Sequence, residues 1–180
     1  FYYLFVAFTI IPLIILALYS SSLFKDSIIS IDKTELTHRS NLIKEKLETS
    51  QQDSIDLEMF SVRYDNLSGS RVTIISINGK VIADSREVPA QMDNHADRPE
   101  VIEALAGKTG ISQRYSFTLK EDFIYSAVPV YNNEGKIIYV LRTGFPLTGV
   151  QKETTNANTA LFLTVLFFGL IVLVIGYISI

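Results

Sequence analysis

The sequence predicts an α+β domain held between two membrane-spanning helices, and three observations support this prediction. Residues 1–24 and 154–180 contain no charged residue, and each run exceeds the roughly 20 apolar residues needed to cross a bilayer. All 16 basic and 19 acidic residues lie between these runs, in a stretch of roughly 130 residues that is long enough for one domain. That stretch contains helical patterns and five apolar, β-branched runs separated by turn residues.

The composition excludes several functional classes. The chain has no cysteine, so neither a disulfide framework nor a thiolate metal site can form. The net charge of −3 provides no basic patch of the kind that nucleic acid requires. The sequence has no Gly-rich phosphate loop and no Ser-His pair in a supporting context. We therefore expect neither a hydrolase nor a nucleotide-binding site in this chain.

The two uncharged runs define the expected membrane topology. We predict a first transmembrane helix over residues 1–22 and a second over residues 159–180. The chain opens at Phe1 without a basic n-region, so we expect it to start inside its first span and to be a fragment at both ends. A cleaved signal peptide, with Ser20 and Ser22 near the cut site, is the alternative. With two spans, the charge-rich middle is external and the continuation past the second span is cytoplasmic.

A polar helix is expected to continue out of the first span over residues 23–50. It contains neither Gly nor Pro, and apolar residues recur every seven positions at Ile29, Leu36 and Ile43. This stripe faces a second copy of the helix in a signalling dimer, covers one face of the sheet, or does both at different heights. Residues 148–158 are predicted to be a polar connector between the domain and the second span.

The central domain, residues 51–147, is predicted to contain two short helices and five strands. The first helix covers Gln51 to Asp65, with Ile55, Met59 and Phe60 facing inward and a turn at residues 66–69. Asn78-Gly79 between two β-branched runs is a strong hairpin signal. Gly107 ends the second helix, which covers Glu100 to Ala106. The predicted strands are Val72 to Ile77, Lys80 to Asp84, Ile111 to Ser116, Phe123 to Val130 and Lys136 to Thr143, the last two central and buried on both faces.

Six pieces of the domain, in order, resemble one family. They are GKVIADS (Gly79 to Ser85), NHADRPEV (Asn94 to Val101), EALAGKTG (Glu103 to Gly110), RYS (Arg114 to Ser116), YSAVPV (Tyr125 to Val130) and GKIIYVLRTGFPL (Gly135 to Leu147). This order resembles the extracytoplasmic sensor domain of bacterial membrane sensor histidine kinases, and is most similar to the phosphate-regulon sensor kinase and related cell-envelope stress kinases.

The resemblance implies a fold and a cellular setting. The fold is PAS-like (PDC, single-Cache), with a long N-terminal helix packed on a five-stranded antiparallel sheet. The protein is expected to be a homodimer in the bacterial inner membrane, with a cytoplasmic HAMP linker, a phospho-accepting His and a kinase domain that uses ATP and Mg²⁺ to signal to a response regulator. The only histidines here, His38 and His95, fall outside the membrane, so we expect no catalytic residue and no cofactor in this segment.

The resemblance also places a ligand pocket on the sheet face beneath the loop and the short helix. Arg offers a bidentate fork to a carboxylate or phosphate, so a small anionic ligand is one hypothesis for this pocket. In the alternative, Arg98 pairs with Asp84 or Asp97 and Arg114 lies on a solvated strand face. The candidate ligand-binding residues are His95, Arg98, Arg114, Tyr115, Lys120 and Tyr125.

We consider the acidic sequence DNHAD as a metal site, because Asp93, His95 and Asp97 occupy every second position in it. Their spacing matches no strong ligand motif, so no metal site is predicted. Asp97 instead suits the N-cap of the helix that Pro99 opens.

The expected role is to pass an envelope or nutrient signal inward. The signal would move the polar helix relative to the end of the last strand, so Pro146 and Leu147 join Ile29, Leu36 and Ile43 as candidate signalling or dimer residues. The expected partners are a second copy, the lipid bilayer and a small anion or envelope component, without nucleic acid. Alternatives attach the same domain to a chemoreceptor or cyclic-dinucleotide enzyme, or make it a membrane-anchored binding or scaffold protein.

Overall fold

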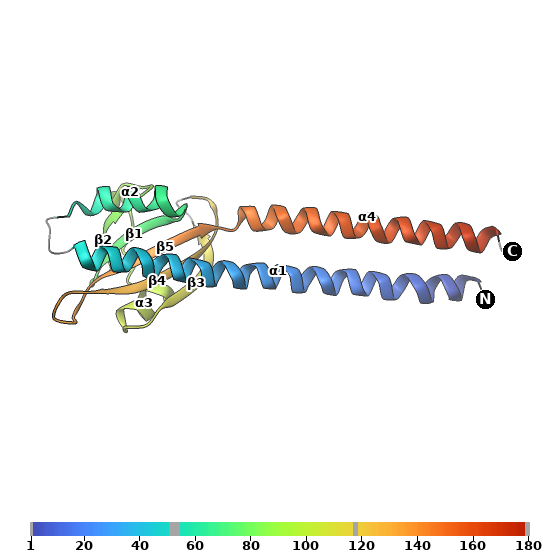
Figure 1. Ribbon diagram of the computed structural model, residues 1–180, viewed down its shortest axis with the longest axis horizontal. Coiled ribbons are helices and arrows are strands. Elements are labelled where there is room, and N and C mark those ends of the chain that lie inside the picture. The colour runs from blue at the N-terminus through green and yellow to red at the C-terminus, as the bar shows by residue number, and fades with distance from the viewer. Residues whose placement is uncertain (1, 51–54, 117–118, 179–180) are drawn as a thin grey trace. The chain divides into compact units, whose positions relative to one another are not determined.

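The computed structural model describes residues 2–50, 55–116 and 119–178, and in parts of the first and last helices it describes the backbone alone. By internal contacts the chain divides into two units: Ile31–Leu147 is one, and Phe1–Ser30 together with Thr148–Ile180 is the other. The elements in chain order (Figure 1) are α1 (Tyr2–Thr49), α2 (Leu57–Ser68), β1 (Arg71–Ser76), β2 (Val81–Asp84), η2 (Pro89–Gln91), α3 (Pro99–Leu105), β3 (Gly110–Ser116), β4 (Glu121–Tyr131), β5 (Ile137–Pro146) and α4 (Thr148–Ile178).

Two long helices contain the uncharged runs. The helix α1 continues without a break from Tyr2 to Thr49, as expected for a membrane segment that extends into a polar helix. The connector predicted over residues 148–158 is helical and runs directly into the apolar part of α4. Within the described residues, one stretch, Thr159–Ile178, is both long and apolar enough to cross a bilayer.

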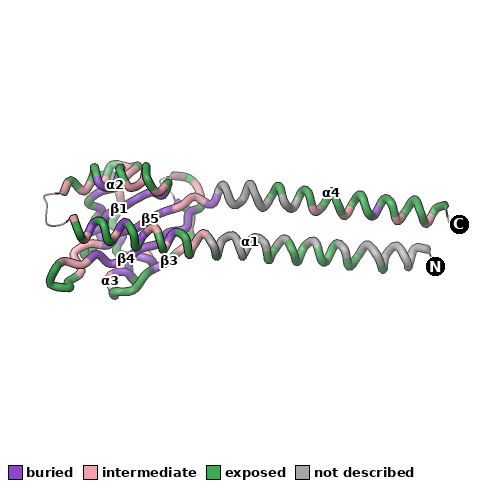
Figure 2. The backbone as a smooth tube through the Cα atoms, viewed as in Figure 1, coloured by how far each residue is buried: buried purple, intermediate pink, exposed green. Residues whose placement is uncertain are grey.

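The five strands form one antiparallel sheet in the order β2-β1-β5-β4-β3. The hairpin predicted at Asn78-Gly79 joins β1 to β2, and the turn at residues 132–135 joins β4 to β5. The strands β4 and β5 lie inside the sheet and are largely buried, as their near-continuous apolar sequences predict. Figure 2 shows buried residues concentrated in the strands.

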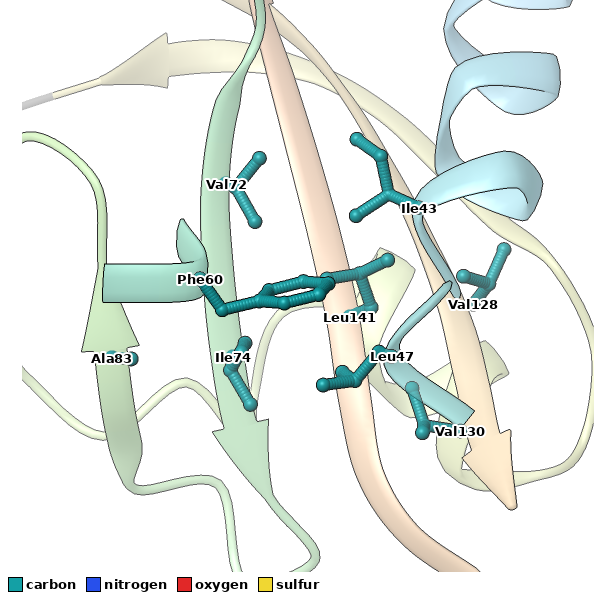
Figure 3. Packing of buried hydrophobic residues seen from close by; sticks show 9 residues of the cluster. All are labelled: Ile43, Leu47, Phe60, Val72, Ile74, Ala83, Val128, Val130 and Leu141. Carbon is teal, nitrogen blue, oxygen red and sulfur yellow. The ribbon is translucent and has the colours of Figure 1, made fainter. Parts of the chain in front are cut away.

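One face of the sheet is covered by α1 and α2. Figure 3 shows Ile43 and Leu47 of α1 and Phe60 of α2 directed onto side chains of the strands, Leu141 among them. Leu36 is also buried, and the Ser40 hydroxyl lies 2.6 Å from that of Thr143 on β5. The cluster contains Ile43, Leu47, Phe60, Val72, Ile74, Ala83, Val128, Val130 and Leu141.

This packing bears on the heptad stripe of α1. Leu36 is 2% exposed and Ile43 is 4% exposed within a single chain, so both serve as core residues that hold α1 on the sheet. At these two positions α1 therefore covers the sheet, as one of the predicted alternatives states. The side chain of Ile29, the third member of the stripe, lies outside the described residues.

The opposite face of the sheet carries a second, smaller core under α3. Val101 and Ala104 of α3 pack with Ile75, Ala127 and Val140 of the strands. Val81 completes this cluster, and Met92 and Leu105 border it. The part of this face that the cluster leaves uncovered is polar, and it forms the candidate site.

Two helix boundaries differ from the predictions. The helix α2 begins after the N-cap Asp56, whose carboxylate accepts the N–H groups of Glu58 and Met59, and it ends at Ser68, not at Asp65, with Gly69 as its C-cap. The expected turn at residues 66–68 is therefore helical, and Met59 is 69% exposed because it lies on the outer side of this helix. Residues 51–54 of the predicted helix lie outside the described residues.

The N-cap predicted at Asp97 is wrong. The residue before α3 is Arg98, which makes no side-chain capping bond, and the Asp97 carboxylate lies 3.5 Å from the guanidinium of Arg98 instead. Pro99 at the first helical position needs no hydrogen-bond acceptor for its nitrogen, which reduces the demand for a side-chain cap.

Candidate functional site

The strand register brings charged side chains to the sheet face opposite α1. Successive side chains of a strand point to opposite faces, and Arg142 on β5 is paired with Thr73 on β1 and Ala127 on β4. Its neighbour Thr143 contacts α1, so Arg142 points the other way. The same alternation places Arg71 (β1), Asp84 (β2), Arg114 (β3) and Tyr125 (β4) on the face that Arg142 occupies.

A cavity of about 290 Å³ lies on this face. Its floor comes from the strands and its rim from the loop between β2 and α3. The volume is near the lower end of the range for small-molecule pockets. The lining residues are Arg71, Glu87, Gln91, Met92, Asp93, His95, Arg98, Arg114, Ser116, Tyr125 and Arg142.

Arg142 is one of two fully buried cations of the floor, with Arg71. It is 2% exposed, and its guanidinium lies 4.7 Å from the centre of the Tyr125 ring. Its Nη2 donates to the Thr73 hydroxyl at 3.2 Å, whereas Nη1 is 3.6 Å from a Glu100 oxygen and, like Nε, has no hydrogen-bond acceptor among the described residues. Burial lowers the pKa of Arg142 to about 10, so the side chain keeps its charge at neutral pH with donors to spare.

Glu100 is shared between two guanidinium groups. Its buried carboxylate accepts Ser112 Oγ at 2.5 Å and Arg114 Nη2 at 3.2 Å, and it lies beside Arg142. Burial alone would raise the pKa of Glu100, but the Ser112 hydrogen bond and the charge of Arg114 outweigh burial and lower it. One carboxylate therefore faces two cations, Arg114 and Arg142. This leaves the floor with a positive charge that a bound anion would neutralise.

Arg71 forms a buried ion pair with Asp84. Its Nε lies 3.0 Å from one oxygen of Asp84 and 3.1 Å from the other, and the Thr73 hydroxyl also donates to Asp84 at 2.7 Å. Asp84 additionally accepts the backbone N–H groups of Arg86 and Glu87. This ion pair thus fixes the start of the loop that forms the rim. It uses Nε of Arg71, whereas Nη2 lies 4.0 Å from the Met92 sulfur, so this guanidinium also has donor capacity at the cavity.

Two cations of the site lie against the aromatic ring of Tyr125. Arg114 lies 4.4 Å from its ring centre, so two guanidinium groups contact one aromatic ring, an arrangement that stabilises buried cations. The ring extends over Gly144 of β5, where an added Cβ would come within 3.0 Å of it. The absence of a side chain at Gly144 therefore allows Tyr125 to lie across the neighbouring strand.

The loop that carries His95 is docked on the β1–β2 hairpin. The His95 N–H donates to Gly79 O at 2.8 Å, and Asn94 Nδ2 donates to Asn78 O at 2.9 Å. Gly79 has φ +84°, and a Cβ there would collide with Asn94 and Ala96. The turn residue that makes the hairpin thus also makes room for the loop.

Four of the six predicted ligand-binding residues line the cavity: His95, Arg98, Arg114 and Tyr125. Tyr115 follows Arg114 on β3 and points to the other face, where it is partly exposed. Lys120 is exposed in the β3–β4 turn with φ 57°. Neither of these two lines the cavity, and whether any of the six binds a ligand stays a prediction.

The alternative pairings proposed for the arginines hold in part. Arg98 does contact Asp97, while Asp84 is paired with Arg71. The placement of Arg114 on a solvated strand face is wrong, because Glu100 and the Tyr125 ring hold its side chain in the cavity wall.

Sequence reasoning missed three charged residues at the floor of this site: Arg71, Glu100 and Arg142. A usable signal exists for Arg142, since it is the lone charged residue inside the apolar strand IIYVLRTGFP, and a charge in such a position needs partners. Within the described residues, no group of three His, Asp or Glu side chains is placed to hold a metal ion.

Of the two candidate signalling residues at the end of β5, Leu147 is buried and Pro146 is half-buried. Pro146 pairs with Phe123, and Leu147 is buried, with its N–H donating to Asp122 O at 2.8 Å. The exit of the domain toward α4 is therefore fixed to β4, the strand that carries Tyr125.

Solved structures of bacterial sensor domains have the same fold as this chain. The sensor domain of the V. cholerae histidine kinase DctB matches with a TM-score of 0.59 and 21% identity, over 74% of this chain and 56% of that one. The E. coli DcuS sensor domain matches with a TM-score of 0.55 and 12% identity, over 70% of this chain and 98% of that one. The predicted α+β fold is thus confirmed as that of PDC/Cache sensor domains.

A chemoreceptor domain shows the same fold. The ligand-binding domain of the Campylobacter jejuni chemoreceptor Tlp3, in complex with 4-methylisoleucine, matches with a TM-score of 0.57 and 17% identity, over 76% of this chain and 58% of that one. The chain thus spans little more than half the length of the DctB and Tlp3 domains. No family model and no curated protein matches the sequence.

Proposed function

We propose that Ile31–Leu147 is an extracytoplasmic sensor domain that binds a small molecule through its carboxylate or another oxyanion. The observation that carries this proposal is the buried guanidinium of Arg142, which has unpartnered donors and shares its one acidic neighbour with Arg114. Leaving buried charged donors unpaired is costly. A bound oxyanion would pair them, and Met92 and Tyr125 would contact its less polar part.

The wider proposal is a membrane receptor with this domain outside the cell. Its finer parts are two membrane spans, a homodimer and a cytoplasmic histidine kinase. That kinase would use ATP and Mg²⁺ and signal to a response regulator. These parts rest on the sequence patterns described above, as does the similarity to the phosphate-regulon sensor kinase. A chemoreceptor output is the second candidate, because the Tlp3 ligand-binding domain has the same fold.

The test is to titrate the purified chain with acetate, succinate, sulfate and phosphate and to measure binding by calorimetry. At least one anion should bind, and Arg142→Gln should weaken it by about 10- to 100-fold, since a charge-assisted hydrogen bond contributes about 1.5–3 kcal/mol. The control is Lys136→Gln, which removes an exposed cation of the β4–β5 turn and should leave binding unchanged.

A second variant covers the case in which Arg142→Gln fails to fold. Arg98 lies at the rim, with about a quarter of its side chain exposed, so Arg98→Gln should fold normally and still weaken the anion. Wild-type protein that binds none of the four anions, or variants that bind as tightly as the Lys136→Gln control, would contradict the proposal.

A further inference from the structure

The titratable side chains that line the cavity are arginines, carboxylates, one tyrosine and the imidazole of His95. It is 6% exposed, and its Nδ1 is buried without a hydrogen-bond partner among the described residues. The loop position is fixed, because the His95 backbone is hydrogen-bonded to Gly79 and the neighbouring Asn94 side chain is hydrogen-bonded to Asn78. The imidazole is thus held in the cavity wall with an unused polar atom.

The charges that surround His95 are of both signs. The cations come from three strands and from the residue before α3. Three of the carboxylates, Asp84, Asp97 and Glu100, pair with arginines, whereas Asp93 is exposed and Glu87 is half-buried. The cations are Arg71 on β1, Arg98 before α3, Arg114 on β3 and Arg142 on β5. The carboxylates are Asp84 on β2, Glu87 and Asp93 on the loop, Asp97 before α3 and Glu100 on α3, and the phenol of Tyr125 on β4 also lines the cavity.

These surroundings oppose a positive charge on His95 while the cavity holds no anion. Burial, together with Arg142, Arg98 and Arg114, lowers the pKa of His95 to about 4, so the imidazole is neutral at physiological pH. An anion in the cavity would reverse this balance, because it cancels part of the arginine charge and offers an acceptor to a protonated imidazole, which donates from both ring nitrogens.

We propose that His95 takes up a proton from solvent when the anion binds, so that this site recognises an anion and a proton together. The proposal rests on the anion-binding function proposed above. The proton goes to the imidazole ring, and the protonated ring donates a hydrogen bond to the anion. The domain would then respond to the anion more strongly in acidic surroundings.

The sign of the pH dependence follows from linkage. Between the pKa of His95 in the anion-bound protein and its lower pKa in the free protein, binding takes up a proton, so affinity rises as pH falls. The rise is at most about tenfold per pH unit for a single proton. Above the higher pKa and below the lower one, affinity no longer depends on His95.

The experiment uses sulfate, which stays doubly charged over this range, and acetate as a carboxylate probe. The chain contains only two histidines, His38 and His95, so labelled imidazole signals can be followed by NMR in the purified full chain as pH is varied. The exposed His38 of α1 is an internal reference. We expect sulfate to raise the pKa of His95 but not that of His38. Affinity measured by calorimetry should rise as pH falls, and this dependence should disappear in His95→Gln and persist in His38→Gln.

The outcomes separate this inference from the function it rests on. If sulfate or acetate binds but the pKa of His95 does not move and affinity lacks the His95-dependent rise, proton uptake is refuted and anion binding stands. If His95→Gln fails to fold, the NMR titration of the wild-type chain decides alone. If neither probe binds at any pH, the anion site and the proton uptake are both refuted.

Discussion

Arg142 lies in the middle of the sheet, where a charged side chain is costly to bury unless partners offset its desolvation. Thr73, Glu100 and the Tyr125 ring supply only part of that offset, because two of its nitrogens have no hydrogen-bond acceptor among the described residues. Apolar residues of similar volume would fill such a position at lower cost. The proposed role in anion binding would account for an arginine at this position.

His95 makes stability depend on pH in a defined direction. Its folded-state pKa of about 4 lies below the ordinary value of 6.5, so the unfolded chain binds the proton more readily and stability falls as pH decreases from about 6.5 to about 4. Two and a half pKa units correspond to about 3 kcal/mol. Urea unfolding of wild-type protein and His95→Gln between pH 7 and pH 4 should show this loss for the wild type only. An equal loss in both proteins would contradict the neutral, buried state of His95.

The loop over the site depends on the hairpin beneath it. Gly79 and Gly135 both adopt positive φ in β-turns, yet a Cβ at Gly135 meets nothing within 4 Å, while one at Gly79 collides with Asn94 and Ala96. Gly135→Ala should therefore lower the free energy of unfolding by only about 1–2 kcal/mol, the cost of placing alanine at positive φ. Gly79→Ala should cost about 1–3 kcal/mol more and also weaken anion binding, because the loop that holds His95 must move.

Urea midpoints and anion titrations of the two glycine variants test this coupling between hairpin and loop. Gly135→Ala serves as the matched control, since it has the same backbone strain without the collision. Equal stability losses, with unchanged anion affinity in both variants, would show that the loop does not depend on close approach at Gly79.

Sequence patterns predicted the secondary structure of the domain where local signals are strong. Asn78-Gly79 located the first hairpin, and the apolar runs located the central strands, because turn chemistry and burial act over a few residues. The heptad stripe of α1 was ambiguous, since the same spacing serves a dimer seam and a sheet-covering helix. Only the packing of Leu36 and Ile43 on the sheet distinguishes them.

The site was predictable in part for the same reason. His95, Arg98, Arg114 and Tyr125 belong to recognisable sequence pieces, and the structure brings them to one cavity. The pairing of Arg142 with Glu100 joins residues that are 42 positions apart, and it depends on strand order and register. Local sequence does not encode such a long-range contact.

At the scale of the whole molecule, the proposed topology places the β4–β5 turn outside the cell. The chain lacks cysteine, so Glu134→Cys introduces a single thiol at an exposed position of this turn. A membrane-impermeant maleimide should label it in intact cells whose outer envelope is permeable to the reagent. Val128→Cys, buried in β4, should react only after unfolding. Labelling of Glu134→Cys only after lysis of the inner membrane would place the domain in the cytoplasm.

The anion site itself is best tested by crystallography with selenate, a tetrahedral oxyanion whose selenium gives an anomalous signal. In crystals of the chain grown with selenate, we expect the strongest anomalous peak in the 290 Å³ cavity, with oxygens within hydrogen-bond distance of Arg142 and Arg114. The proposal that this buried arginine cluster binds an anion would be contradicted by peaks confined to surface lysines. A cavity without selenium, while selenate binds elsewhere, would contradict it equally.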